Sequence, residues 1–457
     1  MSEMIDIVVD NKTYKAKEGS LLIDLLIKEK IKVPYFCYHE ALGADGNCRM
    51  CMVEIEGQKR PQISCDTFIK ANMKVHSTGN NIEKVRRDIL ELELINHPVD
   101  CPVCDQAGEC SLQDFYMDYG LHNSEVLIQE KIKHTKHIDL GANVILDQER
   151  CVLCARCTRF TEKITKTHEL GIIGRGDEAR VSTMPHRKLH NPYAMNVVDL
   201  CPVGALTSKD FRFSQRVWFL QTVNSICHGC AKGCNIFIDH NKIKYKDDLI
   251  YRFRPRRNDE VNGFFMCDEG RLSYKALQDN RQEVTLLNAK AITEEEALLE
   301  AKRLIEEYKN NISVVIDANL YTQEIEAILE FSKKIGASAY APLEVYYDEN
   351  FKDDMLKSAN RGANSQTIEL LTIDTSTPKE SGLVINFNHP DTFNSETVIN
   401  FLTHKKALNS LIFPMAVFTE NTGTLRNEEG IVQHCEQAIF KNTPIPTLIE
   451  TVKKIQL

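Results

Sequence analysis

The chain has 457 residues, enough for about three domains with cores of their own. Its 56 lysines and arginines and 65 aspartates and glutamates give a net charge of −9, which disfavours nucleic acid or an anionic membrane surface as a partner. The sequence starts without the basic and then apolar pattern of a secretory signal, and its apolar runs fall well short of the ~20 residues that cross a bilayer, so a cytoplasmic protein is expected.

The opening residues predict a β-hairpin over 4–16, with its turn at residues 10–11. Apolar residues at helical spacing then predict a helix that begins after Ser20, its expected N-cap, and ends before Pro34. A hairpin followed by a helix and a cysteine-bearing loop indicates a small α+β domain over residues 1–80.

Cysteine is the residue that distinguishes this chain. Fifteen of its 16 cysteines lie in the first 270 residues, and only Cys435 lies beyond them. Because the cytosol keeps thiols reduced, such crowding favours metal sites over disulfides. Together with His97, the fifteen cysteines make four sets of four candidate ligands.

The first set has the spacing C-x10-C-x2-C-x13-C and consists of Cys37, Cys48, Cys51 and Cys65. Gly43 and Gly46 are expected to let the backbone approach inorganic sulfide closely. Plant-type ferredoxins hold a [2Fe–2S] cluster with C-x4-C-x2-C and a distant fourth cysteine. The first gap is longer here, so a zinc knuckle stays open as the alternative.

Residues 81–95 predict an amphipathic helix that leads into the second set. Its expected apolar face consists of Ile82, Val85, Ile89, Leu92 and Ile95. We expect this helix to hold the next ligand loop against the first domain.

The second set is His97, Cys101, Cys104 and Cys110, in a loop whose Pro and Gly residues prevent a regular helix. Short spacings of this kind suit an iron–sulfur cluster, and a histidine with three cysteines suits structural zinc equally well. In a cluster, one neutral imidazole in place of a thiolate lowers the negative charge and makes the centre harder to oxidise. His97 could instead be a core or surface histidine beside a three-cysteine site.

The third set is Cys151, Cys154, Cys157 and Cys201, the last followed by Pro202. A C-x2-C-x2-C triplet completed by a distant Cys-Pro is the bacterial ferredoxin arrangement for [4Fe–4S]. Zinc sites pair two C-x2-C hairpins and fit this triplet poorly. Thr161 stands where a two-cluster ferredoxin has a further cysteine, so one such cluster is predicted here.

The fourth set has the spacing C-x2-C-x3-C-x32-C and consists of Cys227, Cys230, Cys234 and Cys267. Gly229, Gly233 and Gly270 are expected to permit tight backbone around a cluster. Four cysteines suffice for one cluster, so His228 is expected to be an outer or surface residue.

Beyond residue 280, helices at 293–308 and 322–334 alternate with strands at 312–316, 382–386 and 411–418. This alternation predicts a doubly wound α/β domain with a mainly parallel sheet. The domain carries neither a P-loop nor a dinucleotide fingerprint. Residues 340–380 show no clear pattern.

The order of the four sets closely resembles that of the large iron–sulfur subunits of respiratory complex I, the bacterial NADH-quinone oxidoreductases. The resemblance rests on Cys37…Cys65, on His97-Pro-x2-Cys101-Pro-x-Cys104-Asp-x2-Gly-x-Cys110, on Cys151…Cys201-Pro and on Cys227…Cys267. It implies one [2Fe–2S] cluster on the first set and three [4Fe–4S] clusters on the others. In that family the first three clusters lie on the route from a flavin-bearing subunit towards quinone, and the fourth is set apart.

The resemblance also implies a ferredoxin-like (β-grasp) fold for the first domain. Residues 418–433 resemble a piece of a molybdopterin-oxidoreductase domain, but residues 281–457 are too few for the whole domain, so no molybdopterin is expected. We therefore expect five domains: 1–80 with [2Fe–2S], 81–120 with the histidine-containing [4Fe–4S] set, 121–219 with a bacterial-ferredoxin-like [4Fe–4S] set, 220–280 with the fourth set, and 281–457 without an evident cofactor.

These features predict an electron-relay subunit of a proton-translocating NADH-quinone oxidoreductase, without substrate chemistry of its own. It would pass electrons from a flavin-bearing partner, or from another low-potential donor such as a ferredoxin or flavodoxin, towards quinone. Its expected partners are a flavin- and NADH-binding subunit and quinone-side iron–sulfur subunits, with membrane contact only through them, at the inner (plasma) membrane. The main alternative is an electron-input subunit of a hydrogenase or formate dehydrogenase, although an iron hydrogenase needs more cysteines after residue 270 and a formate dehydrogenase needs a full molybdopterin domain. A structural zinc scaffold is the third hypothesis.

Overall fold

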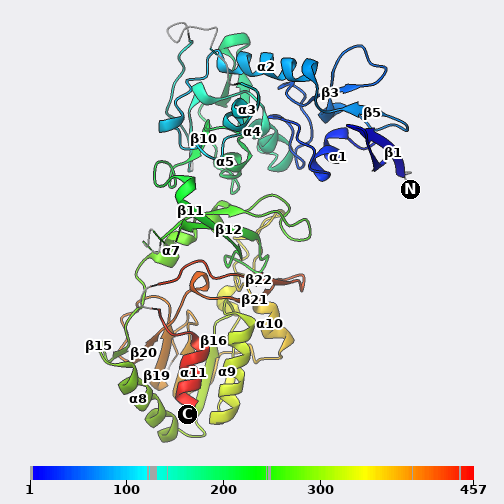
Figure 1. Ribbon diagram of the computed structural model, residues 1–457. Coiled ribbons are helices and arrows are strands. Elements are labelled where there is room, and N and C mark those ends of the chain that lie inside the picture. Colours follow the sequence, from blue (N-terminus) through cyan, green and yellow to red (C-terminus); the bar gives the residue numbers. More distant parts are fainter. Residues whose placement is uncertain are drawn as a thin grey trace. The chain divides into compact units, whose positions relative to one another are not determined.

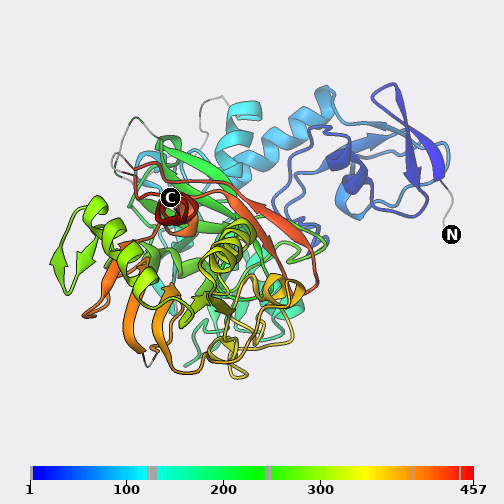
Figure 2. The ribbon, with the colours of Figure 1, turned by 90° about the horizontal axis from the view of Figure 1, so that it is seen from below.

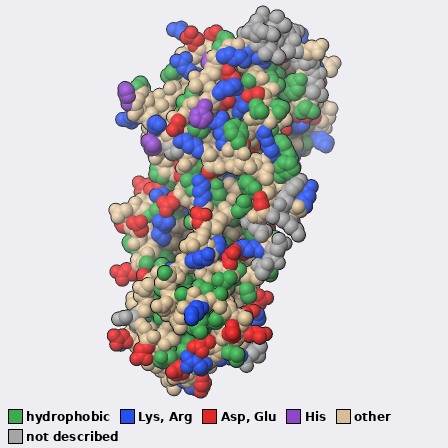
Figure 3. All heavy atoms as spheres, turned by 90° about the vertical axis from the view of Figure 1, so that its left-hand side faces the viewer, with side chains coloured by type: hydrophobic (Ala, Val, Ile, Leu, Met, Phe, Trp, Pro, Cys, Tyr) green, Lys and Arg blue, Asp and Glu red, His purple; other side chains and the backbone are tan. Residues whose placement is uncertain are grey.

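The structure is a computed structural model that describes residues 4–120, 123, 131–141, 143–242, 244, 247, 249–393, 395–441 and 444–456. The chain folds into two compact units, Met1–Trp218 and Phe219–Leu457 (Figure 1). Within the described residues, none of the helices combines the length and apolarity that crossing a membrane requires. On the face drawn in Figure 3, acidic and basic side chains are interspersed in both units.

The first domain is a five-stranded mixed sheet with one helix packed on it. The strand order is β2-β1-β5-β3-β4, and the neighbours β1 and β5 run parallel. Helix α1 buries Leu22, Ile23 and Leu26 against Ile7 and Val9. Its elements are β1 (Met4–Val9), β2 (Lys12–Lys17), α1 (Leu22–Lys28), β3 (Met52–Ile55), β4 (Gln62–Ile63), the short helix η1 (Ser64–Asp66) and β5 (Lys74–His76). This is the predicted ferredoxin-like fold.

The predicted hairpin is present, because β1 and β2 pair antiparallel around Asp10 and Asn11. Both turn residues have positive φ, 47° and 66°, which asparagine and aspartate tolerate better than other side chains. The prediction of Ser20 as a helix cap was wrong by one residue. Leu21 occupies that position, and the Ser20 hydroxyl instead donates to the Lys17 carbonyl at 2.7 Å.

Helix α2 (Asn80–Leu94) lies within one residue of its predicted bounds, but its buried face differs from the prediction. Ile82, Arg86 and Leu90 are buried, whereas Leu92 is 68% exposed. The Arg86 guanidinium donates to the Met52 carbonyl at 3.0 Å and the Ser77 carbonyl at 2.9 Å, both in the first domain. A buried cation therefore joins α2 to that domain, as expected of the helix but by a contact that apolar periodicity does not reveal.

The remainder of the first unit consists of short elements separated by ligand loops. A three-stranded sheet in the order β10-β7-β6 and a two-stranded sheet, β8-β9, are the extended parts. The elements are η2 (Cys101–Val103), α3 (Ser111–Tyr119), β6 (Ile138–Gly141), β7 (Val144–Leu146), η4 (Gln148–Arg150), α4 (Arg156–Arg159), the π-helical turn η5 (Phe160–Ile164), β8 (Leu170–Ile173), η6 (Gly176–Glu178), β9 (Arg180–Thr183), α5 (Asn196–Leu200), β10 (Leu206–Ser208) and η7 (Val217–Phe219).

The second unit begins with a three-stranded antiparallel sheet in the order β11-β12-β13. The strands are followed by two short helices, and the loop between β11 and β12 carries three cysteines of the fourth set. The elements are β11 (Leu220–Ile226), β12 (Asn235–Asn241), β13 (Ile250–Pro255), α6 (Asp268–Leu272) and α7 (Tyr274–Gln278).

A seven-stranded sheet in the order β15-β14-β20-β19-β18-β16-β17 forms the rest of the second unit. The five strands from β20 to β17 are parallel, in the 2-1-3-4-5 order of doubly wound folds, so the predicted α/β class is confirmed. The strands are β14 (Leu286–Leu287), β15 (Lys290–Ala291), β16 (Ile312–Ile316), β17 (Ser338–Tyr340), β18 (Ser381–Phe387), β19 (Ser395–Leu402), β20 (Leu411–Pro414) and the separate pair β21 (Gly423–Arg426) and β22 (Val432–Cys435).

Helices α8, α9 and α11 share one apolar core with the parallel strands (Figures 1 and 2). Thr293 caps α8 as its sequence suggests: its hydroxyl accepts from the Glu296 amide, and the Glu296 carboxylate accepts from the Thr293 amide. Strand β19 was not predicted, and the predicted strand 411–418 already ends at Pro414. The helices are α8 (Glu294–Glu307), α9 (Thr322–Ile335), η9 (Glu344–Tyr346), α10 (Ser365–Leu370), η10 (Phe418–Glu420) and α11 (Leu448–Gln456).

Candidate iron–sulfur sites

The four cysteines of the first set come together in the first domain, and all are buried. Cys37 and Cys48 lie on the loop between α1 and β3, with 3.4 Å between their sulfur atoms. The amides of Phe36 and Cys37 both donate to the Cys48 sulfur at 3.5 Å. Hydrogen bonds from Cys48 and Cys65 hold the pKa of the Cys37 thiol well below its usual range. One thiol of this set is therefore poised to ionise, as metal binding requires.

Two glycines of the first ligand loop have backbone conformations that favour glycine. Gly43 and Gly46 have φ angles of 74° and 77°, which other residues rarely adopt. A Cβ atom on Gly46 would meet only the Ile63 side chain, at 3.2 Å, and one on Gly43 would have open space. Left-handed turns are thus one reason for glycine at these positions, and the close approach to sulfide stays a prediction.

The third set surrounds a small apolar pocket that is lined by Cys151, Cys154, Cys157 and Cys201. Cys157 lies on α4 and Cys201 directly follows α5. The Leu153 amide donates to the Cys151 sulfur at 3.4 Å. Burial raises the pKa of Cys154 to about 12, and the neighbouring Cys201 adds to the rise. These thiols stay protonated until a bound cation compensates the negative charge of the thiolates.

In the second set, the structure brings the three cysteines together on η2 and at the start of α3. Burial raises the pKa of Cys110 to about 11, and the nearby Cys104 adds to that rise, as Cys101 adds to the rise in the pKa of Cys104. Burial lowers the pKa of His97 to about 4, which leaves the imidazole neutral at pH 7, the form that binds metals. The Val99 amide donates to His97 Nδ1 at 3.2 Å and orients the ring. Among the described residues, no hydrogen bond joins His97 to these cysteines.

The fourth set lines a pocket of about 460 Å³ in the second unit. The Gly229 amide donates to the Cys227 sulfur at 3.4 Å, and the Gly270 amide donates to the Cys267 sulfur at 3.3 Å. A Cβ atom on Gly270 would lie 2.9 Å from the Cys227 sulfur, so glycine is needed there for space, as expected. His228 is not at the surface. Its ring is buried and stacks on the Phe418 ring, with 3.8 Å between the two ring centroids.

Arg361 borders the fourth pocket and was missed in the sequence, because it lies in the unpatterned segment 340–380. Its Nε donates to the Gly229 carbonyl at 2.9 Å and an Nη to Glu269 at 2.8 Å. Burial raises the pKa of Cys227 and Cys230, and the charge of Arg361 opposes that rise. Cys435, the cysteine outside the four sets, is fully buried in a separate apolar cluster.

The residues present fit iron–sulfur clusters. All 16 cysteines are free thiols, and backbone amides donate to sulfur in the first, third and fourth sets. Such hydrogen bonds are one of the means by which proteins tune cluster potentials. Among the described residues, no three histidine, cysteine or acidic side chains converge on a point that would suit a single metal ion. A cluster spreads its ligands over several irons and does not require such convergence.

Arginines beside the third set contact the ligand loops of other sets. Guanidinium groups of α4 donate to carbonyls of the first ligand loop, Arg156 to Tyr38 at 2.7 Å and Arg159 to Gly43 at 2.8 Å. In addition, Arg150 next to Cys151 forms two hydrogen bonds with Asp100 of the second loop, at 3.0 and 2.6 Å. The third set therefore contacts both of the sets that precede it in the sequence.

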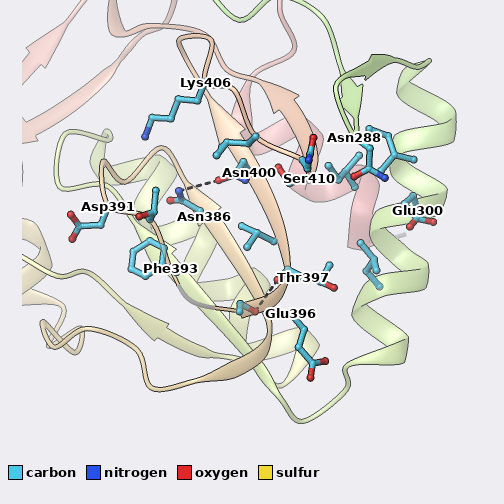
Figure 4. Close-up of a pocket in the computed structure, with 18 of the residues that line it drawn as sticks. Asn288, Glu300, Asn386, Asp391, Phe393, Glu396, Thr397, Asn400, Lys406 and Ser410 are labelled. Carbon is cyan, nitrogen blue, oxygen red and sulfur yellow. Dashed lines mark hydrogen bonds between the residues drawn. The ribbon is translucent and has the colours of Figure 1, made fainter.

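A pocket of about 380 Å³ lies in the α/β domain, and its lining includes residues of β18 and β19 (Figure 4). Its floor holds Asn386 on β18, Asn400 on β19 and Ser410. Asn386 donates to Asn400 at 3.1 Å, and Asn400 donates to Ser410 at 3.0 Å. These polar groups satisfy one another, and no sequence motif marks them.

Four family models match successive parts of the chain, and each interval contains one of the cysteine sets. The 2Fe-2S iron-sulfur cluster binding domain matches residues 2–80, and the NADH-ubiquinone oxidoreductase-G iron-sulfur binding region matches 86–125. The ferredoxin-like domain of NADH-quinone oxidoreductase subunit 3 matches 141–207, and the molybdopterin oxidoreductase Fe4S4 domain matches 220–279. The chain thus contains both 2Fe–2S and 4Fe–4S binding domains.

Relatives that align with about three quarters of the chain agree with these matches. The NADH-ubiquinone oxidoreductase 75 kDa subunit of Reclinomonas americana is 34% identical over 370 residues, which cover 78% of this chain and 52% of the relative. The G subunit of NADH-quinone oxidoreductase from Rickettsia bellii is 34% identical over 342 residues, which cover 74% of this chain and 49% of the relative. The chain spans about half the length of these relatives. A solved NAD+-reducing [NiFe]-hydrogenase is 26% identical, with a TM-score of 0.41, and the similarity covers 47% of this chain and 91% of that one. The chain therefore belongs to the family of iron–sulfur proteins that contains the G subunit of NADH-quinone oxidoreductase and the 75 kDa subunit of NADH-ubiquinone oxidoreductase.

Proposed function

We propose that this chain is the electron-relay subunit of a proton-translocating NADH-quinone oxidoreductase. In this proposal Cys37, Cys48, Cys51 and Cys65 hold a [2Fe–2S] cluster, and three [4Fe–4S] clusters are held by His97, Cys101, Cys104 and Cys110, by Cys151, Cys154, Cys157 and Cys201, and by Cys227, Cys230, Cys234 and Cys267. Each cluster, when bound, supplies one-electron redox chemistry. The chain's own residues bind it, keep water from it and donate amide hydrogens to its sulfur ligands.

The observation that carries the proposal is that the third set contacts the ligand loops of both the first and the second. Electron relay requires centres that are close together in a dry protein matrix. The loops of the three sets are joined by buried arginine contacts, without an intervening domain. A scaffold that used zinc only to stabilise separate modules would have no need of such adjacency.

The partners in this proposal are a flavin- and NADH-binding subunit as electron donor and quinone-side iron–sulfur subunits as acceptor. The membrane is reached through those subunits. The chain is proposed to comprise five functional segments, residues 1–80, 81–120, 121–219, 220–280 and 281–457, the last without a cofactor of its own.

The first test is the content of iron, acid-labile sulfide and zinc in the anaerobically purified chain, followed by low-temperature EPR after reduction with dithionite. We expect about 14 iron atoms per chain and signals of both cluster types. Stoichiometric zinc with little iron or sulfide would overturn the proposal in favour of a scaffold.

The partner assignment needs a second experiment. A complex isolated through an affinity tag on this chain should reduce a quinone with NADH. If the same complex oxidised hydrogen or formate instead, the electron-input alternative would replace the relay of a quinone reductase.

A further inference from the structure

Two buried arginines of α4 connect the first and the third ligand loops. Arg156 is 9% exposed and Arg159 is 6% exposed. One Nη of Arg156 donates to the Tyr38 carbonyl at 2.7 Å, and the other donates to the Leu200 carbonyl at 3.2 Å. Tyr38 follows Cys37 and Leu200 precedes Cys201, so a single guanidinium joins the peptides next to ligands of two different sets.

Arg159 contacts the first loop at more points. Its guanidinium donates to the Gly43 carbonyl at 2.8 Å and to the Cys37 carbonyl. Lys163 donates to the Leu42 carbonyl at 2.9 Å from the following turn. The planar fork of arginine can reach several carbonyls at once, which a lysine ammonium cannot do in the same geometry.

The charge of these side chains is only weakly balanced by protein carboxylates. Asp45 lies 3.9 Å from Arg159 Nε, and within the described part of the chain no carboxylate pairs with Arg156. Arg156 Nε has no hydrogen-bond partner there, and the Tyr35 ring lies 5.9 Å from its guanidinium carbon. Burying an unpaired cation is costly, so an anion is expected nearby.

The thiols of the two ligand sets can supply that anion. Arg156 donates to the carbonyls of Tyr38 and Leu200, so its charge lies one residue away from Cys37 of the first set and from Cys201 of the third. A cluster held by four thiolates is anionic and gains a further negative charge on reduction. A fixed cation beside it therefore stabilises the reduced state more than the oxidised state.

We propose that Arg156 and Arg159 form a guanidinium clamp that positions the first ligand loop against the third and raises the reduction potentials of the clusters held there. This inference rests on the proposed function only in assuming that both sets bind clusters. The two arginines are positioning residues and bind no iron themselves.

The test uses the iron-loaded full-length chain and compares R156Q, R156K and R49Q. Arg49 is an exposed cation between Cys48 and Cys51, so R49Q removes a charge that water screens. EPR-monitored redox titration gives the midpoint potential of each cluster type, and hydrogen exchange gives the protection of amides in residues 38–47.

We expect R156Q to lower the reduced-to-oxidised ratio of the first cluster about tenfold at a fixed solution potential, a shift of 59 mV for one electron. R49Q should change that ratio less than twofold. R156K keeps the charge but not the fork, so it should keep the potential while amides 38–47 exchange faster than in the unmodified chain.

Equal potentials in R156Q and the unmodified chain, with iron retained, would overturn the electrostatic role. Unchanged exchange in R156K would overturn the clamp. If R156Q does not retain iron, amide exchange in R156K and R159K decides the clamp, and a lowered potential in these variants despite the retained charge would overturn the electrostatic role. Absence of iron from the unmodified chain would refute the proposed function, and exchange of residues 38–47 in metal-free R156K would still test the clamp.

Discussion

The two units are built by different means. The α/β part of the second unit has a continuous apolar core, in which aromatic rings of neighbouring strands stack, as Phe387 and Phe401 do at 4.5 Å. In the first unit, the helices α3, α4 and α5 beside the second and third cysteine sets have nine, four and five residues, and arginines that donate to loop carbonyls join its parts. The sheet can be stable through hydrophobic burial alone, whereas the ligand loops depend on what they bind.

Removal of iron should destabilise the ligand loops of the first unit far more than the parallel sheet of the second, and this is the largest difference that we expect. Structural metals contribute on the order of 10 kcal/mol to the folding of small metal-binding domains. In the iron-free chain, amides around Cys151 and Cys201 should lose most of their protection from hydrogen exchange, while those of β16 and β18 should keep theirs. Equal loss in both regions would show that the distinction between the units is wrong.

Truncation of Phe387 should destabilise the second unit and leave the ligand loops of the first unit unchanged. The side chain is fully buried, and a phenylalanine-to-alanine change at such a site costs about 3–5 kcal/mol. F387A should lower the denaturant midpoint of the second unit without changing the iron content of the first three sets. Leu299, 70% exposed on α8, is the control, and L299A should stay within about 0.5 kcal/mol of the unmodified chain.

A buried carboxyl in the second unit should make its stability depend on pH. Burial raises the pKa of Glu324 from 4.5 to about 7, so the native state binds a proton that the unfolded chain has released between these values. The free energy of unfolding should therefore fall as pH rises from about 5 to 8, by up to about 3 kcal/mol from this group. Chemical denaturation at about pH 5 and about pH 8 should show that the free energy of unfolding changes less with pH in E324Q than in the unmodified chain. The same slope in both proteins would contradict this origin.

Arg86 tests the polar attachment of α2 to the first domain. R86M leaves the Met52 and Ser77 carbonyls without this donor and should lower the free energy of unfolding of the first domain by about 1–3 kcal/mol. Arg87 is the adjacent exposed arginine, so R87M is the matched control and should have little effect. Similar effects of both changes would mean that helix propensity, not the buried contact, is responsible.

The sequence determined what depends on neighbours along the chain. The spacing of the cysteines defined four sets, each of which falls in its own family-model match, and local periodicity located the first hairpin, α8, β16 and α9. Thr293 could be recognised as a cap because its partner, Glu296, is three residues away. The ligand roles within each set, including that of His97, stay predictions.

Tertiary structure decided what depends on residues far apart. Strand β19 lacked a distinctive pattern and is defined by pairing with β18 and β20. The buried face of α2 passes through Arg86 because carbonyls of the first domain lie opposite it. Likewise, the roles of Arg156 and Arg361 arise where loops from distant parts of the chain meet. The contacts of the third set with the first and the second could not be predicted from sequence, since adjacency in space follows from packing and not from order along the chain.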